Sequence, residues 1–162
     1  MAASSNLERL SANTPDGCLA LGMHREIIQG VGATYTLSNE ESGALCKFDR
    51  AAGVVYTLPS SPNEGTWFEF RTTVTITSNA AKVITAGTKY ILGTVFGYTT
   101  DATEIDGFSA DGSTHVAISS NGSTTGGVIG DCYTLVYDGT QWLVEGNIFC
   151  GTATPATPFA TS

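Results

Sequence analysis

Apolar and polar residues alternate along the segment 67–77. Its even positions are apolar except for Thr72, and its odd positions after Trp67 are polar. Successive side chains of a strand point to opposite faces, so this pattern predicts a half-buried β-strand with one apolar and one Thr-rich face. A shorter alternation covers 53–58, and the Pro, Ser, Asn and Gly residues of 59–65 favour a reversal of the chain between the two segments. We therefore predict that the two segments form an antiparallel hairpin.

Further short alternating runs recur along the chain, and most of them end at Gly, Asn, Asp, Ser or Pro. The expected strands are 33–37, 44–48, 53–58, 67–77, 82–86, 89–95, 115–119, 132–137 and 141–146. The last two form the clearest hairpin, because the Asp138-Gly139 pair between them tolerates the positive φ of a tight turn. Many short strands at this spacing predict an all-β fold, an antiparallel β-sandwich of jelly-roll-like or barrel-like form. The segments 98–114 and 119–130 are predicted to be surface loops.

The two ends of the chain differ in composition from the middle. Residues 1–30 contain a helix capping box at Ser5–Glu8, but a Thr-Pro-Asp-Gly break at 14–17 leaves one or two turns, which water alone does not keep helical. Residues 151–162 are rich in Pro, Thr and Ala and cannot bury a face of their own. We therefore predict an N-terminal arm (1–30), a β-sandwich domain (31–150) and a C-terminal tail (151–162).

Composition limits the classes of partner. The chain has 162 residues, of which 41% are hydrophobic and 14% are charged, and this fits one folded domain with extensions. The formal net charge of -8 argues against nucleic acid and against anionic membranes, because both bind through Lys and Arg. No apolar run reaches the about 18 residues of a membrane span. Glu8 and Arg9 lie where a secretory signal needs apolar residues, so no such signal is visible.

The chain has four cysteines: Cys18, Cys46, Cys132 and Cys150. They form no C-x-x-C pair and have no His at zinc-ligand spacing, so we expect no zinc site. Four cysteines permit three disulfide pairings, which the sequence does not rank. In a reducing cytosol, free buried thiols that pack as small hydrophobic side chains are the expected state.

The segment 98–114 concentrates four carboxylates: Asp101, Glu104, Asp106 and Asp111. Calcium binds carboxylate oxygens on flexible loops, so a cation site is one interpretation of this segment. The spacing misses the EF-hand pattern and no Glu closes the loop, which favours a solvated loop. We expect no cofactor.

The sequence predicts no catalytic site. The nucleophile elbow G-x-S-x-G is absent. Neither His24 nor His115 has an evident nucleophile beside it, so we interpret both as surface or capping histidines. Trp67 and Trp142, with several tyrosines, could form a surface on which carbohydrate stacks, although a β core, which we favour, also explains these aromatic residues. We therefore expect that the protein is not an enzyme.

Four motifs, in their order along the chain, resemble those of a β-sandwich module of tailed bacteriophages. They are "TLSNEESG" at Thr36–Gly43, "GVVYTLP" at Gly53–Pro59, "GTWFEF" at Gly65–Phe70 and "GDCYTLVYDGTQWLV" at Gly130–Val144. The resemblance covers about residues 34–146. Modules of this type are similar to head decoration (cement) proteins, which sit as trimers on the capsid and reinforce it with their terminal arms. Related modules also occur in fibres and in tail-associated proteins.

The resemblance implies a structural protein of the virion, made in the host cytoplasm, that binds the major capsid protein on the outer surface of the capsid as a homotrimer and stabilises the mature head. The alternative is a fibre or tail-associated module that binds host-surface glycans through loops and exposed aromatic residues. The candidate capsid contacts are apolar residues of the arm, because a solvated tail rarely carries so many of them and each is worth about 1.5–3 kcal/mol when fully buried. They are Leu7, Leu10, Leu19, Leu21, Met23, Ile27 and Ile28.

Overall fold

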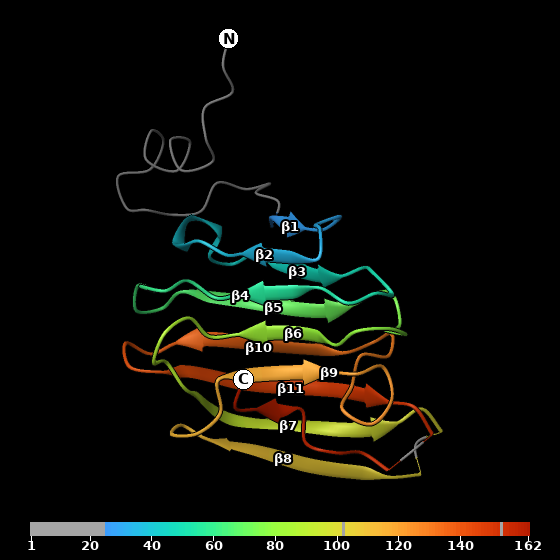
Figure 1. Ribbon diagram of the computed structural model, residues 1–162. Helices are drawn as coiled ribbons and strands as arrows, with labels where there is room; N and C mark the ends of the chain where they lie inside the picture. Colours follow the sequence, from blue (N-terminus) through green and yellow to red (C-terminus); the bar gives the residue numbers. More distant parts are fainter. Residues whose placement is uncertain (1–24, 102, 153) are drawn as a thin grey trace.

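The structure, a computed structural model, describes residues 25–101, 103–152 and 154–162, and shows two β-sheets packed face to face (Figure 1). Sheet A has seven strands, in the spatial order β1 (Ile27–Ile28), β3 (Leu45–Phe48), β5 (Trp67–Thr72), β10 (Cys132–Tyr137), β11 (Trp142–Cys150), β7 (Ile91–Thr99) and β8 (Ile105–Asp111). Sheet B has five strands, in the order β12 (Phe159–Ala160), β9 (Ala117–Ser120), β6 (Ala81–Ile84), β4 (Val55–Thr57) and β2 (Thr34–Thr36). The helical structure of the described residues is one turn of 3-10 helix, η1 (Asn39–Glu41). The predicted all-β sandwich is confirmed.

The first six strands alternate between the two sheets. β1, β3 and β5 lie in sheet A, whereas β2, β4 and β6 lie in sheet B, and each strand pairs in parallel with the next strand of its own sheet. The later strands add antiparallel pairs, so both sheets are mixed rather than purely antiparallel. Figure 1 shows the result as a ladder of strands that starts at β1 and β2 at one end of the sandwich and reaches β7 and β8 at the other.

The predicted antiparallel hairpin of 53–58 with 67–77 is not formed. β4 lies in sheet B and β5 lies in sheet A, so the connection between them crosses from one sheet to the other. An apolar row can be buried beside a neighbouring strand or against the opposite sheet, and the sequence alternates in the same way in both cases. Here the two rows face each other, since the rings of Tyr56 and Phe70 meet across the core with centroids 5.7 Å apart.

The hairpin of β10 and β11 is confirmed. The two strands pair over the whole length of β10. Asp138 accepts hydrogen bonds from the backbone N–H groups of Thr140 and Gln141, both at 2.8 Å. Gly139 has a φ of 97°, in the left-handed region that favours glycine. The Asp-Gly pair therefore closes this turn for the reason expected from the sequence, because glycine tolerates the positive φ of a tight turn.

The predicted loop 98–114 contains the whole of β8, which the sequence analysis missed. The inward-facing residues Phe108 and Ala110 alternate with Gly107 and Ser109, and this is a weak hydrophobic contrast. Pairing with β7 over seven residues supplies the hydrogen bonds that define the strand. β7 directly precedes β8 in the chain, so the pairing is local, and the strand was missed because of its weak alternation.

The sandwich also extends into the predicted arm and tail. Ile28 of β1 and Phe159 of β12 are each only 6% exposed, and both belong to the core. β1 pairs with β3, and β12 pairs with β9. Each strand has two residues, which is too short for a periodic signal. The described ends of the chain are thus parts of the two sheets rather than separate extensions.

The core between the sheets is rich in aromatic residues. Phe48, Tyr56, Phe70 and Tyr133 are at most 2% exposed. Their successive ring centroids lie 5.3, 5.7 and 5.5 Å apart. Trp142 is fully buried as well. Aromatic pairs at these distances stabilise a core beyond the area that they bury, so the functional interpretation turns to the side chains that face solvent.

Candidate functional site

The outer face of sheet A, which points away from sheet B, is the candidate functional surface. Along β5, β7, β10 and β11 the outward positions alternate with buried ones. Most of the large apolar side chains that are exposed in the described part of the chain lie on this face: Ile27, Trp67, Phe96, Ile105, Val136 and Leu143. Contiguous exposed apolar side chains commonly mark a binding surface.

One row of these side chains crosses four adjacent strands. Cross-strand pairing places Trp67 beside Val136, Val136 beside Leu143, and Leu143 beside Leu92. Trp67 and Val136 are both 36% exposed, and Leu143 is 38% exposed. We call these four residues the apolar row.

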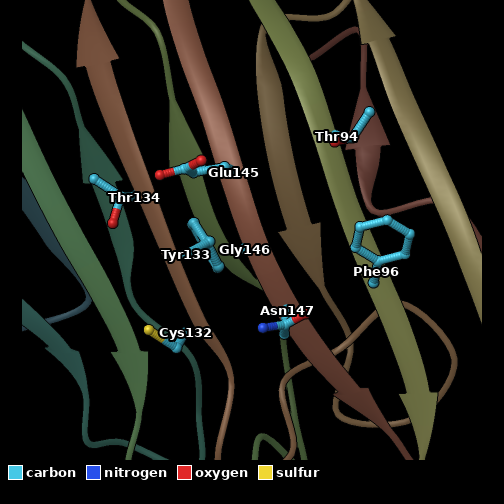
Figure 2. A pocket seen from close by; sticks show the side chains of 8 residues that line it. All are labelled: Thr94, Phe96, Cys132, Tyr133, Thr134, Glu145, Gly146 and Asn147. Atoms are coloured by element: carbon cyan, nitrogen blue, oxygen red, sulfur yellow. The ribbon is translucent and has the colours of Figure 1, made fainter.

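A hollow of about 400 Å³ lies farther along the same face (Figure 2). Its lining residues come from β7, β10 and β11: Thr94, Phe96, Cys132, Tyr133, Thr134, Glu145, Gly146 and Asn147. The register makes Thr134, Glu145 and Thr94 neighbours in one cross-strand row. Cys132, Asn147 and Phe96 form the next row. We call this site the sheet A hollow.

Gly146 allows β11 and β10 to approach closely beside the sheet A hollow. Its φ is 154°, and a Cβ atom at this position would lie 2.4 Å from the carbonyl oxygen of Cys132 and 2.4 Å from the Cα of Tyr133. Real Cβ atoms do not come so close to backbone, so only glycine allows β11 to approach β10 in this way. Figure 2 shows Gly146 between Thr134 on one side and Phe96 on the other, and the space that a side chain would need there is occupied by β10.

The sheet A hollow combines polar groups with an exposed aromatic ring. Four of its side chains can form hydrogen bonds: Thr94, Thr134, Glu145 and Asn147. Among the described residues, none of these four side chains has a hydrogen-bond partner. The ring of Phe96 is 48% exposed beside them. The hollow therefore offers unused hydrogen-bonding capacity next to a flat apolar surface.

A neighbouring polar cluster on the same face is already paired. Glu69 of β5 accepts hydrogen bonds from Arg25 and, at 2.6 Å, from Nε of Arg71. Partial burial opposes ionisation of Glu69, but the hydrogen bonds from Arg25 and Arg71 outweigh it, so the pKa of Glu69 lies below its ordinary value. This carboxylate is thus committed to its two arginines, unlike that of Glu145.

Arg25 fastens the start of the described chain to sheet A. Besides its bond to Glu69, its guanidinium donates to the carbonyl oxygens of Gly43 and Ala44, at 2.6 and 3.1 Å. It also lies 4.8 Å from the ring centroid of Trp67, within the range of a cation–π interaction. We call this group of contacts the Arg25 clamp.

Asp131, the acidic residue that opens the last of the four motifs, has a structural role. It is 1% exposed and accepts hydrogen bonds from the backbone N–H groups of Gly127 and Phe149, both at 2.6 Å. The hydroxyl of Thr72 lies 3.4 Å away. Burial disfavours the ionised form and raises the pKa of Asp131 to about 6, although these hydrogen bonds act in the opposite direction. Asp131 thereby holds the loop 121–130 against sheet A.

The candidate capsid contacts fall into three groups. Five of them lie outside the described residues: Leu7, Leu10, Leu19, Leu21 and Met23. Ile27 is 52% exposed on the outer face of sheet A, beside Leu45. Ile28 is instead a core residue, because the pairing of β1 with β3 turns it inward, and it is not available for a surface contact.

The structure does not gather the four carboxylates of 98–114 into one site. Asp101 accepts hydrogen bonds from Thr103, and Asp111 accepts them from the backbone of Ser113 and Thr114. Glu104 precedes β8 and Asp106 lies within it. In the part of the chain that the structure describes, no three side chains of the metal-binding types form a group. Asp101 and Asp111 act as caps of local turns.

The histidines and tryptophans have separate positions. His24 lies outside the described residues, and Nδ1 of His115 is 3.7 Å from a carboxylate oxygen of Asp111. Trp142 belongs to the core, as favoured from the sequence, whereas the Arg25 clamp covers Trp67. The exposed ring of the sheet A hollow is Phe96, which the sequence analysis did not single out.

Three of the four cysteines can be placed. Cys46, Cys132 and Cys150 are free thiols, and Cys46 and Cys150 are buried, in agreement with the expected thiol state. Burial raises the pKa of Cys46 to about 12 and raises the pKa values of Cys132 and Cys150 as well. Cys18 lies outside the described residues.

Within residues 25–101, 103–152 and 154–162, no helix is long and apolar enough to cross a membrane. Comparison with protein families, with curated proteins and with solved structures finds no match to this chain. The functional interpretation therefore depends on the motifs of the sequence and on the outer face of sheet A.

Proposed function

We propose that this protein is a structural protein of a bacteriophage virion that binds the outer surface of the capsid and stabilises the mature head. It acts as a homotrimer, and its partner is the major capsid protein. The motif resemblance over residues 34–146 supports this proposal. The net charge of -8 supports a protein partner over nucleic acid or an anionic membrane.

The observation that carries the proposal is the Arg25 clamp. Arg25 directly follows the segment 1–24, and it is held by two backbone carbonyls, by the Glu69 carboxylate and by the ring of Trp67. Charge-assisted hydrogen bonds of this kind are among the stronger ones in proteins. A segment that attaches a domain to a large partner must itself be firmly held by that domain. A force on the segment is then transmitted to the whole sheet and does not separate β1 from it.

The composition of the segment 1–24 supplies the binding energy. Its five candidate contact residues are large and apolar. Full burial of one such side chain is worth about 1.5–3 kcal/mol, from which the entropy lost on ordering is subtracted. Three segments on one trimer raise the affinity further, because binding of the first increases the effective concentration of the others.

The apolar row supports the trimer. Trp67, Val136 and Leu143 are exposed by about a third although they lie on the central strands of a sheet. Contact with another copy of the chain would remove them from water. Trp67 of this row also contacts Arg25, so a subunit contact that leaves the Arg25 clamp free would use Val136, Leu143 and Leu92.

The copy number of the chain in purified virions tests the proposal. Quantitative mass spectrometry compares it with the copy number of the major capsid protein. Comparable numbers support a decoration protein of the head. A far smaller number contradicts this proposal and indicates the alternative, a fibre or tail-associated module.

Deletion of residues 2–22 tests the role assigned to the segment. We expect the shortened chain to melt cooperatively, because the deleted residues precede β1, and to lose most of its binding to capsids in a cosedimentation assay. The matched variant Arg25→Ala keeps the segment but removes its clamp, and we expect binding between that of the full and the shortened chains. A shortened chain that binds as tightly as the full one, or that no longer folds, contradicts the assignment.

A further inference from the structure

We propose that the sheet A hollow is a binding site for a neutral oligosaccharide. This inference goes beyond the capsid role and does not depend on it, since a purified chain would bind sugar whether or not it is attached to a capsid. It rests on the composition, the charge and the rigidity of the hollow.

The polar side chains of the hollow match sugar hydroxyl groups. Each sugar hydroxyl both donates and accepts hydrogen bonds. The carboxylate of Glu145 accepts only, and two adjacent hydroxyls can donate to its two oxygens. Asn147 supplies both a donor and an acceptor, as do the hydroxyls of Thr94 and Thr134. Since none of these groups has a partner within the described residues, a sugar would find their hydrogen-bonding capacity unused.

The ring of Phe96 supplies the apolar part of the site. One face of a pyranose ring carries mainly C–H groups, and such a face packs against an aromatic ring. Phe96 is 48% exposed, and the register places it beside Asn147. The hydroxyl groups of a pyranose lie along the edge of its ring. A sugar that stacks on Phe96 would therefore bring hydroxyls next to the side-chain amide of Asn147.

The charge of the site favours a neutral sugar. Glu145 is the ionisable carboxylate among the lining residues, and the chain has a net charge of -8, so sulfate and carboxylate groups are repelled. The basic residue Arg71 pairs with the lining residue Cys132 in the register and is engaged by Glu69. No basic side chain lines the hollow to offset this repulsion.

The position of the hollow fixes the geometry of its groups. β10, β11 and β7 are inner strands of sheet A, each hydrogen-bonded on both sides. Side chains on such strands are held more accurately than side chains on loops. The volume of about 400 Å³ lies in the range of small-molecule sites. Figure 2 shows Glu145 and Asn147 on β11, with Phe96 on the neighbouring strand β7.

The site is suited to binding rather than to cleavage. Hydrolysis of a glycosidic bond ordinarily uses two carboxyl groups on either side of that bond. Glu145 is the carboxylate that lines the hollow, and the neighbouring Glu69 is held by Arg25 and Arg71. We therefore expect the bound sugar to be released unchanged.

Nuclear magnetic resonance on the labelled full chain tests the proposal. The probes are the neutral disaccharides maltose, cellobiose, lactose and chitobiose, with 3′-sialyllactose and a heparin disaccharide as acidic counterparts. We expect at least one neutral sugar to shift the amide signals of β7, β10 and β11 around the hollow, and the acidic sugars to bind more weakly. Absence of binding by all the neutral sugars, or shifts that map elsewhere, overturns the proposal, as does stronger binding of the acidic probes.

Three variants locate the site. Phe96→Ala and Glu145→Gln should each weaken the binding of the neutral sugar by about tenfold or more. The matched control Ile105→Ala removes a side chain that is 61% exposed on the same face but does not line the hollow, and its affinity should be unchanged. Thermal melts check that the variants fold. Equal losses in all three variants, or no loss in the first two, contradict the assignment, whatever the copy number in virions proves to be.

Discussion

The outer faces of the two sheets present different side chains to solvent. The outward positions of sheet B carry short or β-branched residues, which fit a pleated surface. They include Thr34, Val55 and Ser119 in one cross-strand row, together with the longer, charged Lys82. The outward positions of sheet A carry Trp67, Val136, Leu143 and Phe96, all at least 36% exposed. No strand of sheet B among the described residues exposes a large apolar side chain to this degree.

This difference separates the requirements of folding from those of function. Both sheets bury one apolar face, so the stability of the sandwich requires alternation in each. Folding does not require exposed leucine, tryptophan or phenylalanine on the other face. We interpret the outer face of sheet A as the binding surface of the molecule and that of sheet B as an ordinary solvated surface. The predictions below test this distinction, beginning with the largest effect.

Gly146→Ala should destabilise the protein by about 3 kcal/mol or more. The new Cβ atom would overlap the backbone of β10, and a φ of 154° is strained for alanine. The control Gly107→Ala lies on β8 of the same sheet, where a Cβ would lie an ordinary 3.5 Å from the Phe96 ring. Urea unfolding measures both variants. Similar stabilities would show that the close approach of β10 and β11 is not what shapes the outer face of sheet A.

Asp131, which is buried beside sheet A, should make the free energy of unfolding depend on pH. Its pKa is raised to about 6 in the folded protein and is 3.8 ordinarily, so the folded state binds more protons between these values. The contribution of Asp131 to the free energy of unfolding should therefore be largest below about pH 4. It should fall by on the order of 3 kcal/mol as the pH rises through 6. No carboxylate is buried to a similar degree elsewhere in the described part of the chain.

The variant Asp131→Asn isolates this contribution. Its amide does not titrate, so the difference in unfolding free energy between variant and parent should change between pH 4 and 6 and be constant above pH 7. Denaturant unfolding at a series of pH values gives the two curves. Parallel curves over the whole range would contradict the raised pKa of Asp131.

Substitutions in the apolar row should weaken self-association without unfolding the chain. Val136→Ser and Leu143→Ser each remove a partly exposed apolar side chain, and we expect the trimer to dissociate at about tenfold higher concentration in each case. Ile84→Ser makes the same kind of change on the outer face of sheet B and should leave association unchanged. Sedimentation equilibrium measures the three variants. A parent chain that is monomeric at all concentrations rejects the trimer.

The strands were predictable where the apolar residues alternate over four or more positions. Cys132–Tyr137 has the expected bounds, whereas Trp67–Thr72 forms only the first part of the expected strand 67–77, and residues 73–77 continue it no further. The two-residue strands β1 and β12 could not be found in this way, because two residues contain no period. β8 was missed because its inward-facing Phe108 and Ala110 alternate with Gly107 and Ser109, which is a weak hydrophobic contrast.

The site was less predictable than the strands. Thr94, Cys132, Thr134 and Glu145 lie within expected strands, whereas Phe96 and Asn147 each lie one residue beyond the expected ends of 89–95 and 141–146. However, Phe96 follows the apolar residue Val95, so its own pattern does not tell which of the two is buried. Glu145 and Thr94 become neighbours only through the parallel pairing of β11 with β7, which joins segments far apart in the chain.

By itself, the sequence determined that the protein is an all-β chain of amphipathic strands with a closed Asp-Gly hairpin, because side-chain alternation and turn chemistry are local properties. It did not determine that 53–58 and 67–72 face each other from two sheets, because alternation specifies a buried face but not the strand that buries it. The tertiary structure made that decision through core contacts such as that of Tyr56 with Phe70. It also decided which exposed residues gather on sheet A, since cross-strand neighbours are set by register, and register depends on the packing of the whole core.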